Sequence, residues 1–205
     1  MKHRGRTPAG ELLSRLPEVF GVRELEKFLR YPAQWLVRSA ASGKIVRLQR
    51  GTYWNRYRYP GLTVPYLACH IREAPSYISC EWALHDRGIL LQRPFVCSVV
   101  TLSTSVGRER QIRLMDETIE FSHISKRLFW GFESVEGYFL ATAEKAYLDT
   151  LYYGRDPEEW GELEKDALNP EALRDMAEKF PQWVVKFLVK FLGVISWGQT
   201  LIIRY

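Results

Sequence analysis

The chain has 205 residues, of which 46% are hydrophobic and 26% are charged, and its mean hydropathy is −0.24. This balance is typical of a folded globular protein, and it excludes a disordered chain, a collagen-like repeat and a small disulfide-stapled domain. The formal net charge of +5 is uneven, because residues 1–59 hold 13 Lys or Arg against 4 Asp or Glu. A basic segment at one end favours a polyanionic partner, and a solvated basic surface without a partner is the plain alternative.

The first 50 residues predict three helices. Pro8 can begin a helix whose inward positions are Leu12, Leu13 and Leu16, and Pro17 and Gly21 end it. A second helix is expected over Val22–Leu29, where apolar residues recur three and four positions apart. Pro32 begins a third helix that runs to about Ser42 and is stopped by Gly43.

A hairpin is expected directly after the third helix. Residues Ile45–Arg50 and Thr52–Trp54 are rich in β-branched and aromatic side chains, and they are joined at Arg50-Gly51. Three short helices followed by a small hairpin predict a winged helix-turn-helix domain over residues 1–58.

A second domain is expected over residues 66–205, after a linker at Tyr57–Pro65. Its pattern predicts helices and strands in separate runs, which is an α+β arrangement. The expected helices are Tyr66–Arg72, Ser76–Arg87, Thr142–Tyr153, Pro157–Leu168, Pro170–Lys179 and Gln182–Leu192. The expected strands are Phe95–Ser103, Arg110–Met115, Thr118–Ile124, Leu128–Phe132 and the tail Thr200–Tyr205, with a hairpin turn at Asp116-Glu117.

The third helix is the candidate for insertion into the major groove of DNA, because the second helix of a helix-turn-helix pair takes that position. Its spacing predicts inward packing of Ala33, Leu36, Val37 and Ala40. The outward-facing positions, and hence the candidate DNA contacts on this helix, are Gln34, Arg38, Ser39 and Ser42. A guanidinium can read guanine and a Gln amide can read adenine, so Arg38 and Gln34 are the expected base readers; contact with phosphate or solvent is the alternative for Arg38.

Three cations surround the predicted hairpin. Lys44, Arg47 and Arg50 are expected to contact phosphates, since a wing commonly lies along the DNA backbone. Strand alternation would put Ile45, Arg47 and Gln49 on one face. The basic N-terminal arm with Lys2, Arg4 and Arg6 would add further phosphate contacts.

Other chemistry is weaker in the sequence. Glu144, Lys145 and Asp149 could suggest an enzyme, but Thr142 is a good helix cap and the two carboxylates do not share one helix face. The three cysteines form no CxxC pair, and the pairs Cys69-His70 and Cys80 with His85 have poor spacing for a metal. We therefore expect no enzymatic activity, no catalytic residue, no cofactor and no metal.

Neither a signal peptide nor a membrane span is expected. Glu11, Ser14 and Arg15 interrupt the residues after the basic start, and the most hydrophobic run, Trp183–Ile195, contains two lysines and is too short to cross a bilayer. We expect a cytoplasmic protein without a membrane partner, and buried free thiols fit a reducing compartment. The apolar stripe of the last helix is expected to pack in the core, with an interaction surface as the alternative.

Three stretches together resemble a known family. They are GKIVRLQRGTYW (43–54), APSYISCEWALHDRGIL (74–90) and TAEKAYLDTLYY (142–153), and their order is that of the AbiEi-type antitoxins, the regulators of type IV toxin–antitoxin systems in abortive infection, a phage defence. The family's last stretch usually begins Thr-Pro-Glu-Lys-Ala, and Ala143 stands in the Pro position here.

The resemblance implies a transcriptional regulator with two parts. The winged helix would bind inverted repeats of double-stranded DNA in the promoter of its own operon and repress it. Residues 66–205 would act as the antitoxin against a nucleotidyltransferase-like toxin, without the need for a stable complex. Two alternatives stay open, in which the C-terminal domain is an enzyme or RNA-binding unit, or the chain is a protein-interaction module whose basic surface binds an acidic partner.

Overall fold

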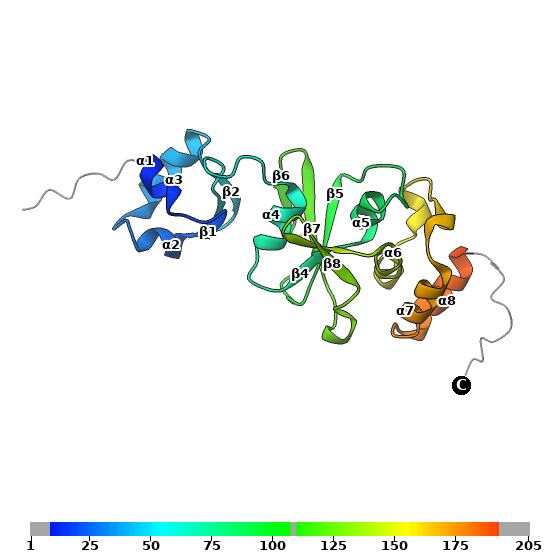
Figure 1. Cartoon of the computed structure of the whole chain (residues 1–205). Coiled ribbons are helices and arrows are strands. Elements are labelled where there is room, and N and C mark those ends of the chain that lie inside the picture. The colour runs from blue at the N-terminus through cyan, green and yellow to red at the C-terminus, as the bar shows by residue number, and fades with distance from the viewer. Residues whose placement is uncertain (1–8, 108–109, 193–205) are drawn as a thin grey trace, which may run out of the picture.

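A computed structural model gives the structure of the protein and describes residues 9–107 and 110–192 (Figure 1). The N-terminal part contains three helices and a small antiparallel sheet whose strand order is β1-β3-β2. Its elements in chain order are α1 (Ala9–Ser14), β1 (Val19–Gly21), α2 (Val22–Glu26), α3 (Pro32–Ala41), β2 (Val46–Gln49) and β3 (Thr52–Trp54).

The predicted helices and hairpin of this part are confirmed, with two differences. Strand β1 lies where only a break between Pro17 and Gly21 was expected, and it pairs with β3 over Val19–Gly21. Helix α2 ends at Glu26 rather than Leu29. Periodicity cannot find a strand of three residues, because its pairing partner lies more than thirty positions away in the sequence.

A compact apolar cluster joins the N-terminal helices to the sheet. It contains Leu12, Leu13, Leu16, Phe20, Leu25, Trp35, Leu36 and Ile45. The buried amide of Asn55 donates to the carbonyl oxygens of Leu13, at 2.8 Å, and Leu16, at 3.2 Å. These bonds satisfy carbonyl groups at and after the end of α1, where no further helical turn can accept them.

The rest of the described chain forms a six-stranded mixed sheet with helices. The strand order is β6-β7-β5-β4-β9-β8; the pairs β4–β9 and β5–β7 are parallel and the others antiparallel. The strands are β4 (Ser76–Ile78), β5 (Val96–Thr101), β6 (Ile112–Leu114), β7 (Glu117–His123), β8 (Phe132–Val135) and β9 (Tyr138–Ala141). The helices are α4 (Val64–His70), α5 (Cys80–Asp86), α6 (Ala143–Tyr152), α7 (Pro170–Ala177) and α8 (Gln182–Leu192), with 3-10 turns η2 (Lys126–Leu128), η3 (Pro157–Trp160) and η4 (Lys165–Ala167).

Helices lie on both sides of this sheet. In Figure 1, α4 lies on the side toward the N-terminal elements, α5 and α6 lie on the other side, and α7 and α8 lie beyond α6. The α+β class is therefore confirmed for the described residues. No helix among them has the length and apolar character needed to cross a bilayer.

Three predicted elements of this part are wrong. The helix expected over Ser76–Arg87 is a buried strand, β4, followed by α5; the strand pairs with both β5 and β9. The strand expected over Leu128–Phe132 instead begins at Phe132, as β8, and β9 follows it. The helix expected over Pro157–Leu168 is two separate 3-10 turns. The β6–β7 turn is Met115-Asp116, one position earlier than expected.

Helix α8 has the predicted bounds and divides its apolar stripe between core and surface. Val184 and Leu188 are fully buried, whereas Trp183 and Phe187 are 41% and 40% exposed. The expectation of core packing is thus confirmed for only part of the stripe. The predicted strand Thr200–Tyr205 lies outside the described residues.

The N-terminal hairpin packs against the larger part of the molecule. Leu48 and Trp54 belong to the same apolar cluster as the six-stranded sheet. The Gln49 amide donates to the carbonyl oxygen of Ile71, at the end of α4, over 3.2 Å. One side of the hairpin is therefore fixed against the larger part of the molecule.

Candidate nucleic-acid interface

Helix α3 begins and ends as its sequence predicts. Pro32 occupies the first turn, where its missing N–H costs no hydrogen bond. The backbone N–H of Ser42 donates to Arg38, and Gly43 follows with a φ of +68°. The positive φ favours glycine and turns the chain directly into β2.

The face that α3 buries differs from the predicted one. Trp35, Leu36 and Ser39 are buried, whereas Val37 is 70% exposed and Ala33 and Ala40 are also exposed. The correction follows from size, because burying the indole of Trp35 removes far more apolar surface from water than burying the side chain of Ala33 or Ala40. The helix is therefore rotated by about one residue relative to the expectation.

This rotation removes one predicted DNA contact and leaves the others at the surface. Ser39 is only 4% exposed, so its expected outward position is wrong. Gln34 and Arg38 lie one turn apart on the exposed face, and the Arg38 Nε donates to the Gln34 carbonyl oxygen over 3.2 Å. Ser42 is exposed, and its hydroxyl donates to the carbonyl oxygen of Ser39.

The cations of the hairpin region are accessible, but their side chains do not follow the regular alternation that was predicted for the strand. Arg47 and Arg50 are exposed and Lys44 is half-buried. The β2–β3 register is irregular between Arg47 and Gln49, and the Gln49 side chain is bonded to the end of α4. Arg47 and Gln49 therefore do not share the one face of the hairpin that strand alternation predicted. A register change of one residue moves the following side chains to the other face. Lys2, Arg4 and Arg6 lie outside the described residues.

An aromatic patch beside α3 was not foreseen. Tyr31, directly before the helix, is 70% exposed, and Phe28 is 46% exposed. The Arg30 guanidinium lies 5.3 Å from the centre of the Tyr31 ring. Rings and cations interleaved at a surface are typical of nucleic-acid contacts. The sequence KFLRY (27–31) carries this signal, but Phe28 was assigned to the apolar face of the helix expected over Val22–Leu29, and Tyr31 to the break before Pro32.

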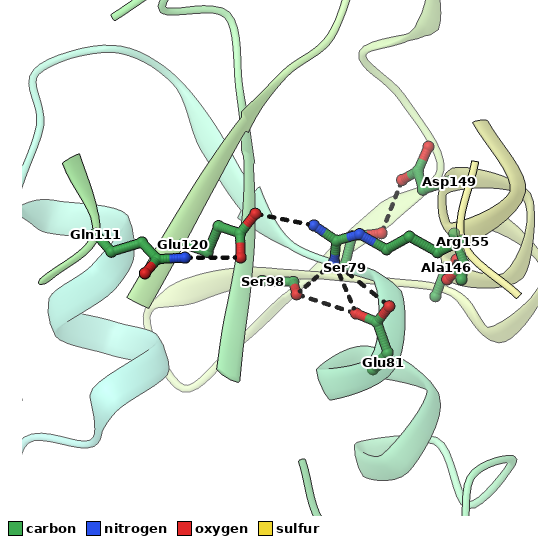
Figure 2. Close-up of polar contacts among 9 residues, drawn as sticks. Ser79, Glu81, Ser98, Gln111, Glu120, Ala146, Asp149 and Arg155 are labelled. Atoms are coloured by element: carbon green, nitrogen blue, oxygen red, sulfur yellow. Dashed lines mark hydrogen bonds and ion pairs between the residues drawn. The ribbon is translucent and has the colours of Figure 1, made fainter. Parts of the chain in front are cut away.

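Two networks of titratable groups lie inside the larger part of the molecule. In the first, shown in Figure 2, the Arg155 guanidinium forms ion pairs with Glu81 and Glu120, both at 3.1 Å, and Ser98 donates to Glu81. Gln111 donates to the second oxygen of Glu120. This network ties α5 and the segment after α6 to strands β5 and β7.

The second network lies between α6 and β4. Lys145 forms an ion pair with Asp149, and its ammonium donates to the Tyr77 hydroxyl over 2.7 Å. Asp149 also accepts hydrogen bonds from Tyr77, at 2.9 Å, and from Ser79, at 2.7 Å. Burial lowers the pKa of Lys145 and raises that of Asp149.

This network has no access for a substrate, since Lys145 and Asp149 are fully buried. Thr142 caps α6 by accepting the Lys145 N–H, as predicted, and Glu144 accepts the backbone N–H of Asn169. Its visible role is to hold α6 against the sheet. The sequence shows the i,i+4 spacing of Lys145 and Asp149, but not their burial.

The cysteine and histidine groups do not come together as metal ligands within the described ranges. Cys80 stands at a sharp strand-to-helix turn, with a φ of +53°, a turn that the sequence did not reveal. Its thiol is fully buried, and burial raises its pKa well above the usual value. His70 stacks on Tyr66, and His85 contacts the carbonyl oxygen of Leu90.

Comparison of the sequence with known proteins adds no relative to this picture. No family model matches the chain, and no curated protein matches it.

Proposed function

We propose that residues 1–58 form a winged helix-turn-helix and that the protein is a transcriptional repressor of its own operon, acting as the antitoxin of a type IV toxin–antitoxin system. The order α1-β1-α2-α3-β2-β3, with the sheet order β1-β3-β2, supports the winged-helix assignment. In such a domain α3 enters the major groove of double-stranded DNA and the hairpin contacts the backbone.

The observation that carries the proposal is the exposed face of α3. Gln34 and Arg38 lie together on it, and in Figure 1 the helix lies on the side of the N-terminal part that is away from the six-stranded sheet. Lys44, Arg47 and Arg50 follow within twelve residues, and none of them forms an ion pair with another described residue. Cations without carboxylate partners are available for phosphates.

The antitoxin part of the proposal rests on the resemblance at residues 43–54, 74–90 and 142–153. The latter two stretches contact each other through Tyr77 and Ser79 on one side and Lys145 and Asp149 on the other. Two of the three resembling stretches are thus in direct contact with each other. The proposed physiological target is a nucleotidyltransferase-like toxin encoded beside this gene.

Operator binding is tested by fluorescence anisotropy with a duplex taken from the DNA upstream of the gene. Arg38→Ala is expected to weaken binding by about tenfold or more, because a bidentate contact with guanine contributes about 1–3 kcal/mol. The matched control is Arg127→Ala, which removes another exposed cation, from η2. Full affinity in Arg38→Ala, or equal losses in both variants, would contradict the assignment of α3.

The antitoxin role is tested separately by co-expressing the full chain with the neighbouring toxin gene, both from unrelated promoters. Wild type is expected to restore growth, and Arg38→Ala is expected to restore it as well, because neutralisation is assigned to residues 66–205. Growth arrest in the presence of folded wild-type protein would contradict the antitoxin role without affecting the DNA-binding result.

A further inference from the structure

A large open cleft lies between the N-terminal part and the six-stranded sheet. Its volume is about 1170 Å³. This is somewhat above the volume of about 300–1,000 Å³ that small-molecule sites usually have. The N-terminal wall comes from β1, the start of α2 and the tip of the hairpin. The opposite wall comes from the end of α4, the segment after β5 and strand β6. A ligand in this cleft would contact both parts at once.

Four arginines line the cleft: Arg23 comes from α2, Arg72 from the segment after α4, and Arg110 and Arg113 from before and within β6. Two carboxylates, Glu24 and Glu73, also line it, so the lining carries a net positive charge. The Glu24 carboxylate already accepts the N–H of Gly21 at 2.8 Å.

None of these four arginines forms an ion pair within the part of the chain that the structure describes. Elsewhere in the molecule Arg87, Arg93 and Arg155 each pair with a glutamate. Positive charges that outnumber the carboxylates of a cleft repel one another, and a bound anion reduces that cost.

Arg72 is held in position before any ligand arrives. Its guanidinium lies 3.7 Å from the centre of the Phe121 ring and donates to the carbonyl oxygen of Ser105. Burial and the charge of Arg110, which also lines the cleft, both lower the pKa of Arg72. A fixed guanidinium loses little conformational freedom on binding, and its planar fork matches phosphate oxygens.

We infer that this cleft binds a small ligand with two or more phosphate groups, such as a nucleoside triphosphate, through Arg72, Arg110 and Arg113, with Arg23 closing the site from the N-terminal part. Several phosphates match several guanidinium groups, whereas a single phosphate would leave most of the charges without a partner. Because the ligand bridges α2 and β6, its binding restrains the N-terminal part relative to the sheet. The inference does not depend on the proposed DNA binding.

The test is isothermal titration of the full chain, in low salt and without DNA, with ATP and with inorganic tripolyphosphate. Both ligands are expected to bind, and the double variant Arg110→Gln/Arg113→Gln is expected to lose about tenfold or more in affinity, since each exchange removes charge-assisted hydrogen bonds. The matched control is Lys126→Gln/Arg127→Gln, which changes the net charge equally on the exposed turn η2 and is expected to bind as wild type does.

Three results would overturn the inference. The first is that neither ATP nor tripolyphosphate binds. The second is that the two double variants lose the same affinity, which indicates unspecific attraction. The third is equally tight binding of citrate, which carries three carboxylates and no phosphate. If only duplex DNA binds, and the Arg110→Gln/Arg113→Gln variant weakens that binding, the cleft contacts the DNA backbone and the small-ligand assignment is wrong.

Discussion

Lys145 forms an ion pair with Asp149, one turn further along α6, and both side chains are completely excluded from solvent. Tyr77 and Ser79 from the sheet side supply further hydrogen bonds to the same carboxylate. Removing charge from water is costly, and this arrangement offsets the cost only while every partner is present. The pair therefore governs how α6 docks on the sheet.

Truncating one partner is expected to be severe. Lys145→Met leaves Asp149 buried without its counter-charge and should lower the free energy of unfolding by about 3–5 kcal/mol, as breaking a buried pair does. Urea denaturation followed by circular dichroism measures the loss. The control is Arg15→Ala, which breaks the exposed pair with Glu11 at the same i,i+4 spacing and should cost less than about 1 kcal/mol. Similar costs in the two variants would contradict the structural role of the buried pair.

Stability is expected to fall as the pH rises above 9. Burial raises the pKa of the Cys69 thiol from its usual 9.0 to about 11 and that of Tyr138 from 10.0 to about 12. In the unfolded chain Cys69 loses its proton near pH 9, whereas in the folded protein it keeps the proton until about pH 11. Between these values unfolding releases a proton, so increasing pH favours the unfolded state.

The expected contribution of Cys69 is about 3 kcal/mol when its full shift is realised. Urea midpoints at pH 7.5, 9 and 10.5 should decrease steadily in wild type. Cys69→Ala should reduce the decrease, because it removes one of the shifted groups. A midpoint independent of pH over this range would contradict the burial of these acids.

Thiol reactivity should separate the three cysteines. Cys80 and Cys97 are fully buried and should react with iodoacetamide only after denaturation. Cys69 is partly accessible, but its raised pKa keeps it protonated at pH 8, and the thiolate is the reactive form. Its labelling rate should therefore rise by about tenfold per pH unit between pH 8 and 10. Peptide mass spectrometry distinguishes the sites, and rapid labelling of Cys80 in native protein would contradict its position.

DNA binding by the proposed interface should depend steeply on salt. If about six cations contact phosphates, the slope of log K against log salt concentration is expected to be steeper than about −4. Arg47→Ala should make the slope shallower by about one unit and weaken operator and unrelated duplexes alike, because a phosphate contact carries no sequence information. Affinity that does not change between 50 and 200 mM salt would exclude this interface.

The elements that were predicted well have their signals in neighbouring residues. Pro32 and Gly43 delimit α3, Thr142 caps α6, and α8 has the predicted bounds. The failures occur where pairing with distant residues decides. Residues Ser76–Ile78 form a strand because β5 and β9 flank them, although the following residues have the pattern of a helix.

The candidate interface shows the same division. The sequence correctly places Gln34, Arg38, Arg47 and Arg50 at the surface. It misplaces Ser39, because two helix faces one residue apart have nearly equal periodicity and only the packing of Trp35 selects between them. It also misses the cleft, whose arginines come from three segments that are far apart in the chain, at positions 23, 72 and 110–113.

By itself the sequence determined the elements that local chemistry specifies, namely the helix caps, the turn of the N-terminal hairpin and the basic N-terminal segment. Tertiary structure alone decided which face of α3 stays exposed, that Lys145 and Asp149 are buried, and that four arginines line one cleft. The physical reason is range: caps and turns depend on groups a few residues apart, whereas burial and charge clustering depend on which distant segments pack together.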